Sequence, residues 1–312
     1  TSSLVGSEMC IRDRIRIKVC FGHFRWGFLR EISVYSFWIF LDSIVSHFYS
    51  SVGQIVLGIY RGATTVAIYA LAIQLKSLFT SFSTALNSVL LPKVTALAAR
   101  EGTENEISDL FIRVGRLQYF VMSFILVGFI IFGKEFIILW GGEDYVQTYY
   151  ITLIIMIPFF FDLISNVGIV VLQAKDKLKY RSAPMIMISL IGLMLTFPFA
   201  NYFGIYGCAC AISISIFVSN VLVSNFVFYK IAEIDVVMYW KQVMRMSLFP
   251  LFVIAFCFCL KFYISIISVF DLCVSILAFS AIYVLINFII NMNDQEKSQV
   301  FGLIRKVNIK LF

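Results

Sequence analysis

The sequence predicts an all-α fold, a polytopic transmembrane helix bundle of about eight spans. Three observations predict it. Hydrophobic residues make up 61% of the 312-residue chain, and the mean hydropathy of +0.92 is too high for a soluble domain with one core. These residues gather in eight long runs. Positive charge falls on every second loop between the runs, as expected when alternate loops face the cytoplasm. A transmembrane β-barrel is excluded because its strands would be shorter and would alternate apolar and polar residues.

Most of the runs reach the roughly 20 residues that a helix needs to cross about 30 Å of hydrocarbon. The last two are almost wholly apolar, so we expect them to be peripheral helices that face lipid. In chain order the runs are 33–59, 66–91, 115–139, 149–172, 183–200, 205–229, 244–263 and 269–290.

The distribution of basic residues predicts the orientation in the membrane. Opposite to the basic loops, the connections hold only Arg61, with Lys134 and Lys261 near helix ends. By the positive-inside rule both termini are cytoplasmic. The net charge of +7 then reflects topology and contact with membrane lipids, and predicts no nucleic-acid partner. The basic loops carry Lys93, Arg100 and Arg113 after the second run, Lys175, Lys177, Lys179 and Arg181 after the fourth, and Lys230, Lys241 and Arg245 after the sixth.

Polar residues share one face of the first, second and fourth runs when the chain is advanced by 100° per residue. The opposite faces of the first two are apolar. Pro158 in the fourth run is expected to kink its helix. The polar faces contain Asp42, Ser43, Ser46, His47, Ser50, Gly53 and Gln54; then Lys76, Ser77, Thr80, Ser83, Thr84, Asn87 and Ser88; then Pro158, Asp162, Ser165, Asn166 and Gln173.

Three of these residues carry charge deep in a predicted span. Lys76 lies about 15 Å into its helix, too far to reach water easily. A charge at such depth costs at least about 2.5 to 3.5 kcal/mol, so Asp42, Lys76 and Asp162 should face a cavity or one another. Either they line a substrate path, or Lys76 and a nearby Asp form a structural pair, while the hydroxyls and amides also suit close helix packing. The candidate path residues are Lys76, Asp42, Asp162, His47, Gln54, Thr80, Asn87 and Asn166.

The sequence contains no nucleotide-binding loop of the Walker type, no zinc motif and no nucleophile elbow. The predicted external loops are also too short to build an active site. We therefore predict that the protein is not an enzyme, holds no metal and needs no cofactor. With catalysis excluded, the function that we predict is the transport of a solute or lipid across the membrane.

Several short stretches, in this order, resemble the carboxyl-terminal half of Wzx-type polysaccharide flippases, relatives of the multidrug and toxin extrusion antiporters. Phe203 and Cys208 depart from the pattern. The stretches are Gly62-Ala-Thr-Thr-Val-Ala-Ile-Tyr69, Leu91-Pro-Lys93, Trp140-Gly-Gly-Glu-Asp-Tyr145, Leu172-Gln-Ala-Lys-Asp-Lys177 and Tyr202-Phe-Gly-Ile-Tyr-Gly-Cys-Ala209.

The resemblance implies two six-helix lobes and two extra helices, of which this chain holds the second lobe and the extra pair. Residues 1–14 resemble translated sequencing adaptor and are left out of the fold prediction. The expectation that the first lobe is missing agrees with the adaptor-like sequence of residues 1–14. The predicted segments are a cytoplasmic lead-in at 15–32, a transporter lobe at 33–229, a cytoplasmic loop at 230–243, two peripheral helices at 244–290 and a cytoplasmic tail at 291–312.

What the resemblance implies for function is a flippase of the bacterial inner membrane. It would move an undecaprenyl-diphosphate-linked oligosaccharide, such as an O-antigen unit of lipopolysaccharide, to the outer leaflet. Lys76 would attract the diphosphate, and Asp42 and Asp162 would couple transport to H⁺ or Na⁺.

Four alternatives stay open. A drug or toxin cation antiporter and a lipid II flippase belong to the same superfamily. A polysaccharide polymerase would need a large external loop, and a purely structural membrane protein would leave the three deep charges unexplained.

Overall fold

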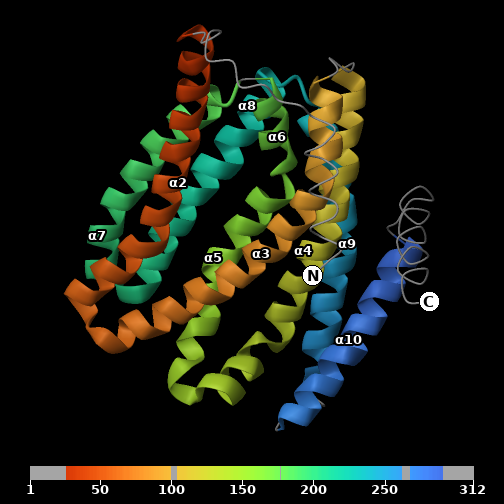
Figure 1. Cartoon of the computed structure of the whole chain (residues 1–312). Helices are drawn as coiled ribbons and strands as arrows, with labels where there is room; N and C mark the ends of the chain where they lie inside the picture. Colours follow the sequence, from red (N-terminus) through yellow and green to blue (C-terminus); the bar gives the residue numbers. More distant parts are fainter. Residues whose placement is uncertain (1–25, 100–103, 176, 262–267, 291–312) are drawn as a thin grey trace, which may run out of the picture.

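The computed structural model describes residues 26–99, 104–175, 177–261 and 268–290 (Figure 1). Every regular element in these ranges is helical, which confirms the all-α prediction. The eight predicted runs fall within helix, apart from Ser165 and Asn166 of the fourth run, which form a turn, and residues 262 and 263, which lie outside the described ranges. The elements are α2 (Trp26–Arg61), α3 (Ala63–Ala99), α4 (Glu104–Gly141), the 3₁₀ turn η2 (Glu143–Tyr145), α5 (Val146–Ile164), α6 (Val167–Ala174), α7 (Lys179–Ile216), the π-helix η3 (Phe217–Val223), α8 (Ser224–Lys230), α9 (Val236–Lys261) and α10 (Val269–Ile290).

Six segments of the described chain are long and apolar enough to span a membrane, which supports a multi-pass membrane protein. Helix α2 is not among them, because the polar residues along one of its faces make the helix as a whole less apolar. The six segments are Ala63–Asn87, Glu106–Gly141, Glu143–Ile164, Lys179–Lys230, Val236–Cys259 and Val269–Asn287.

The segment Lys179–Lys230 holds two of the predicted runs, because the chain reverses direction inside α7. Gly204 has a φ of +64°, which lies in the left-handed region that glycine tolerates best. The two arms of α7 then pack together, and the Ser215 hydroxyl on the second arm donates to the carbonyl of Ile188 on the first at 3.3 Å. The reversal falls in the gap predicted between residues 200 and 205.

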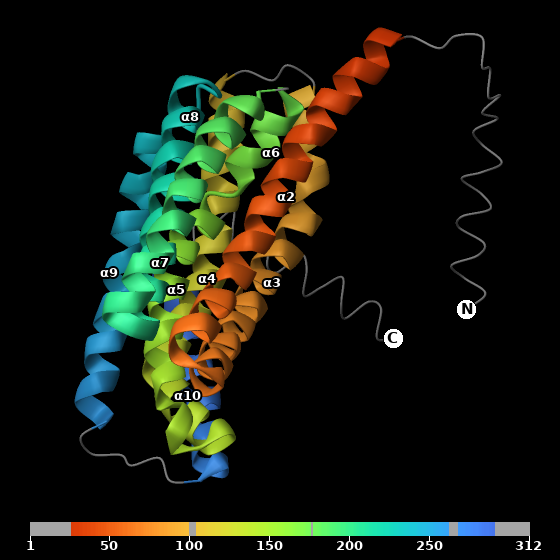
Figure 2. The ribbon, with the colours of Figure 1, turned by 90° about the vertical axis from the view of Figure 1, so that its left-hand side faces the viewer.

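The connections of the bundle gather at two ends. At the end where α2 begins, which we call the basic end, α3 ends and α4 begins, α6 ends and α7 begins, and the α8–α9 turn lies there as well (Figures 1 and 2). Here the Lys175 and Lys177 ammonium groups each donate to the turn after α8, to the carbonyls of Ala232 and Ile231 at 3.0 Å. The basic loops thus share one end. That this end faces the cytoplasm stays a prediction.

At the opposite end, where the loops carry few basic residues, Arg61 has a structural role. Its Nη2 donates to the carbonyl of Asn201 at 2.9 Å, near the end of the first arm of α7. That carbonyl is among the last of the arm, which lack a partner inside their own helix. Arg61 therefore ties the end of α2 to the turn at Gly204.

The fourth run is interrupted after Pro158 rather than at it. Helix α5 continues through Pro158 and ends at Ile164, and a turn at Ser165 and Asn166 leads into α6. Proline removes the hydrogen bond that the carbonyl of Ile154 would accept. The Ser213 hydroxyl on α7 donates to that carbonyl at 2.9 Å, so the proline leaves no unsatisfied carbonyl there.

The loop predicted at 230–243 is shorter in the structure, because α9 begins at Val236. The Asp235 carboxylate accepts from the amide of Met238 at 2.9 Å and so starts the helix earlier. The first turns of α9 also pack on the bundle, where the Tyr239 hydroxyl donates to the carbonyl of Ile164 at 2.7 Å. From α10, Tyr283 donates to the Ser123 hydroxyl of α4 at 3.0 Å. The two last helices therefore do not face lipid alone.

Three buried clusters of apolar side chains lie among the described residues, and α5 contributes to the two larger ones. One lies among α4, α5, α6, α8 and α9, and includes Phe111 and Phe228. The other lies among α2, α3, α5 and α7, and includes Leu57 and Tyr69. Helix α5 thus stands at the centre of the bundle, which places its polar face among several neighbouring helices.

A substitution at Gly115 tests how α9 packs against α4. A Cβ atom there would lie 2.5 Å from the ring of Tyr239, which is fully buried and held through its hydroxyl. We expect Gly115→Ala to lower the free energy of unfolding by about 1 to 3 kcal/mol, the usual cost of overpacking. The control is Gly128→Ala, whose Cβ would stay 3.4 Å from Phe279. Thermal unfolding in detergent measures both, and equal stability would contradict this packing.

Candidate functional site

An ion pair joins α2 to α7 inside the bundle. The Arg181 Nη1 donates to Oδ2 of Asp42 at 3.2 Å, and its Nε donates to the Ser224 hydroxyl of α8 at 2.9 Å. Only 3% of the Arg181 side chain is exposed. The sequence placed Arg181 among the basic loop residues, and that assignment was wrong: the side chain points into the bundle, where Asp42 neutralises it.

Asp162 lies two residues before α5 ends, next to the π-helix η3. Its Oδ2 accepts from the side-chain amide of Asn220 at 3.2 Å, and the Ser219 hydroxyl donates to the amide oxygen of Asn220 at 3.0 Å. Both partners belong to η3. π-Helical turns are rare and occur often at functional sites. The π-helix η3 and the break at the end of α5 therefore both lie next to the carboxylate of Asp162.

Lys76 approaches the same face of α5 from α3. Its Nζ lies 3.9 Å from the ring centroid of Phe159, one helical turn before Asp162. Asp162 interacts electrostatically with Arg181, Lys76 and Asp42. We call Asp42, Lys76, Asp162 and Arg181 the charge cluster. It holds two positive and two negative groups, of which Arg181 and Asp42 form an ion pair, and the attraction between opposite charges offsets part of the cost of burying them.

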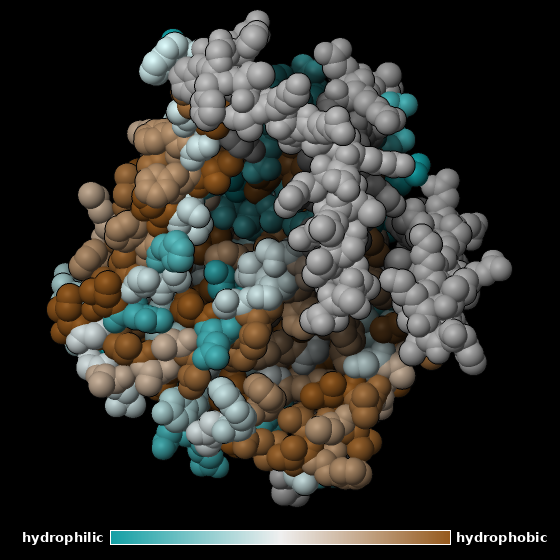
Figure 3. Space-filling view, viewed as in Figure 1, coloured by the Kyte–Doolittle hydropathy of each residue, from teal (hydrophilic) through white to brown (hydrophobic). Residues whose placement is uncertain are grey.

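The charge cluster lies nearer to the basic end of the bundle, since Arg181 is only two residues into α7. In the space-filling view, hydrophilic residues gather in a hollow between α2 and the part of α3 nearer this end (Figure 3). Helix α2 leans away from the bundle toward its first residue, Trp26, which is 79% exposed (Figure 2).

Among the described residues, the structure shows no hydrogen bond from the side chains of the other predicted path residues to the charged groups of the cluster. His47 is exposed, and Gln54, Asn87 and Asn166 are partly exposed. The Thr80 hydroxyl donates to the carbonyl of Lys76 in its own helix at 3.0 Å. These residues follow the polar faces along α2, α3 and the α5–α6 turn.

Sequence reasoning missed Arg181, Asn220 and Ser224. Arg181 follows three lysines, and so had the appearance of one more loop charge. One signal was available: two deep aspartates and one deep lysine leave an excess negative charge that requires a further cation. No comparable signal marks Asn220 or Ser224, since amides and hydroxyls occur throughout these helices.

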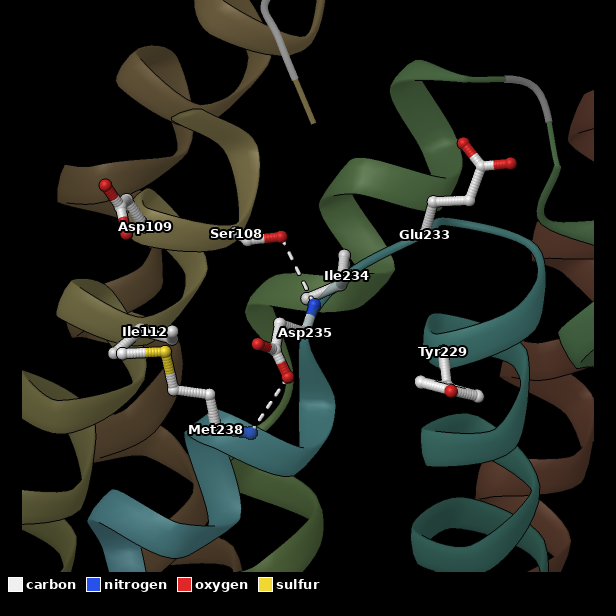
Figure 4. A pocket seen from close by; sticks show the side chains of 8 residues that line it. All are labelled: Ser108, Asp109, Ile112, Tyr229, Glu233, Ile234, Asp235 and Met238. Carbon is white, nitrogen blue, oxygen red and sulfur yellow. Dashed lines mark hydrogen bonds between the residues drawn. The ribbon is translucent and has the colours of Figure 1, made fainter. Parts of the chain in front are cut away.

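A second polar site is a pocket of about 570 Å³ at the basic end, between α4 and the α8–α9 turn (Figure 4). Its polar groups are used to shape that turn: the Ser108 hydroxyl accepts from the amide of Asp235 at 3.2 Å. Among the described residues, no group of three or more His, Cys, Asp or Glu side chains is placed to hold a metal. The pocket is lined by Ser108, Asp109, Ile112, Tyr229, Glu233, Ile234, Asp235 and Met238.

A double-mutant cycle tests the contact between Asp162 and Asn220. We expect Asp162→Ala and Asn220→Ala to show a coupling energy of about 0.5 to 3 kcal/mol, as residues in one hydrogen-bond network do. The control pairs Asp162→Ala with Asn225→Ala, because Asn225 bonds instead to Trp240 at 2.9 Å. Unfolding in mixed detergent micelles gives the energies, and additive effects in the first cycle would contradict the contact.

Comparison with known families gives one match. Residues 3–149, a little under half of the chain, match the model of a family described as Polysaccharide biosynthesis protein. This range includes α2, α3 and α4, and therefore Asp42 and Lys76. It also includes most of the stretch resembling sequencing adaptor. No curated protein and no solved structure matches the chain. The match, with the six apolar segments, supports a multi-pass membrane protein related to polysaccharide biosynthesis.

Proposed function

We propose that this protein is a flippase that moves an undecaprenyl-diphosphate-linked oligosaccharide across the bacterial inner membrane, with its basic end in the cytoplasm. The observation that carries the proposal is the charge cluster, because it places two cations inside an otherwise apolar helix bundle. The family match supports the pathway. The short loops of the described chain agree with transport rather than catalysis.

Lys76 is suited to hold an anionic headgroup. Its ammonium lies over the Phe159 ring, and no carboxylate of the described residues is within ion-pair distance of it. A cation–π contact of this kind orients the ammonium but leaves N–H donors available. In a low-dielectric cavity a diphosphate would bind such a group more strongly than it would in water.

The hydroxyls of α3 suit the sugar part of the substrate. Thr80, Ser81 and Thr84 each donate to a carbonyl of their own helix, at 3.0, 2.9 and 2.9 Å. Their protons are satisfied without another helix, while the oxygens retain lone pairs that can accept from sugar hydroxyls. These residues lie on the turns that follow Lys76. An oligosaccharide bound there would extend along α3 from its diphosphate.

The balance of charges favours this substrate over the cation of a drug antiporter. A cationic drug would need an excess of carboxylates, whereas here each of the two carboxylates already faces a cation. An anionic substrate would instead compete with Asp42 and Asp162 for Arg181 and Lys76. A lipid II flippase would share this chemistry, so the sugar must be identified by experiment.

Complementation of a flippase-deficient strain tests the proposal. The complete reading frame should restore surface polysaccharide, and Lys76→Gln should reduce export at least tenfold, because it removes the cation but keeps the length and polarity. The control is Lys134→Gln, an exposed lysine on α4 near the opposite end. It should export normally at equal expression.

Equal export by the two variants would contradict the role of Lys76. Drug resistance without any export of polysaccharide would contradict the flippase itself and favour the antiporter.

We further propose that H⁺ or Na⁺ drives the transport through Asp162. In proteoliposomes, a gradient of one of these ions should accelerate flipping of a lipid-linked oligosaccharide. Asp162→Asn should lose that acceleration and keep the basal rate within about threefold, because the amide cannot change its charge. Insensitivity of the unmodified protein to both gradients would contradict ion coupling at this residue.

A further inference from the structure

Arg181 has more hydrogen-bonding capacity than its partners use. A guanidinium group carries five N–H donors. The structure shows one bond from Nη1 to Asp42 and one from Nε to Ser224, and Nη2 makes no bond within the described residues. The guanidinium of a side chain that is 97% buried thus keeps N–H donors that no described residue binds and that a further acceptor could use.

The second partner in the ion pair is also incompletely satisfied. Oδ1 of Asp42 is buried and has no hydrogen-bond partner among the described residues. The pair is joined by one bond of 3.2 Å, rather than by the two parallel bonds of a bidentate arginine–carboxylate pair. Asp42 therefore holds Arg181 more weakly than a carboxylate can.

The surroundings favour an anion as the additional ligand. Arg181 and Lys76 both act electrostatically on Asp162, which lies between α3 and α7 on the central helix. An anion with several oxygens could bind both cations at once. A diphosphate has this chemistry, and bidentate recognition of phosphate is a characteristic of arginine rather than lysine.

We propose that Arg181 is a second binding group for the diphosphate of the substrate, and that Asp42 occupies it only while substrate is absent. The inference rests on the proposed function and identifies how the headgroup is held. Substrate displaces Asp42 from Arg181, while the bond to Ser224 keeps the guanidinium in place. Asp42 is thus an internal competitor, and α2 loses its polar contact with Arg181 when substrate binds.

Binding of farnesyl diphosphate to the purified full chain in nanodiscs tests this inference, with farnesol as the control for the apolar tail. Arg181→Gln should weaken binding at least tenfold, the effect of losing a charge-assisted bond. Asp42→Asn should strengthen binding several-fold, because the competitor loses its charge. Arg113→Gln, an exposed arginine of α4, should have no effect.

A double variant separates binding from packing. Arg181→Gln alone leaves Asp42 buried without its cation and can destabilise the bundle. Asp42→Asn with Arg181→Gln restores a neutral pair of similar size. If Arg181 binds substrate, the double variant folds yet still binds at least tenfold more weakly than the unmodified protein. If Arg181 only stabilises the bundle, the double variant recovers the original affinity.

The outcomes also separate this inference from the proposed function. Binding that depends on Lys76 but is unchanged in Asp42→Asn and in the double variant would overturn the inference and leave the flippase standing. Equal affinity for farnesyl diphosphate and farnesol in the unmodified protein would overturn both, since no phosphate group would then be recognised.

Discussion

The neutralisation of charge inside an apolar bundle is the constraint on which the arrangement of the helices depends. Arg181 is buried, so a carboxylate must lie beside it, and Asp42 of α2 supplies that group. Asp162 requires cations in turn, and Lys76 and Arg181 face it from α3 and α7. An unpaired charge of this kind would cost several kcal/mol. The charges therefore specify which faces of α2, α3, α5 and α7 meet.

Backbone carbonyls impose a second constraint, because each interruption of a helix frees groups that hydrocarbon cannot satisfy. At three of these interruptions, a side chain from another element donates to a freed carbonyl. Ser213 bonds Ile154 opposite Pro158, and Tyr239 bonds Ile164 where α5 ends. Arg61 bonds Asn201 before the turn at Gly204. The same bonds that permit the breaks also join distant helices, so irregular backbone and tertiary packing depend on one another.

These constraints explain what the sequence could predict. Hydropathy locates each helix, and the polar faces identified Asp42, Lys76 and Asp162, because periodicity reports the environment of a residue on its own helix. Periodicity does not report which residue of another helix is opposite. Arg181 was therefore assigned to a loop, and Asn220 was missed because its role comes from the π-helix. The break at Ser165 was also missed, since Pro158 is the stronger local signal but Ser213 compensates for it.

The two partners of Arg181 differ in a way that bears on movement. Asp42 lies on α2, which leans away from the bundle, whereas Ser224 lies on α8, which packs within it. Loss of the Asp42 contact would release the basic-end part of α2 from Arg181, while Arg61 and the apolar core would still hold its other end. A buried cation would then never be left without any acceptor, provided that an anionic substrate takes the place of the carboxylate. Exchange of one acceptor for another costs much less than separation of a buried ion pair. An anion that replaces Asp42 at Arg181 would therefore allow the basic-end part of α2 to move, and so would couple helix movement to substrate binding.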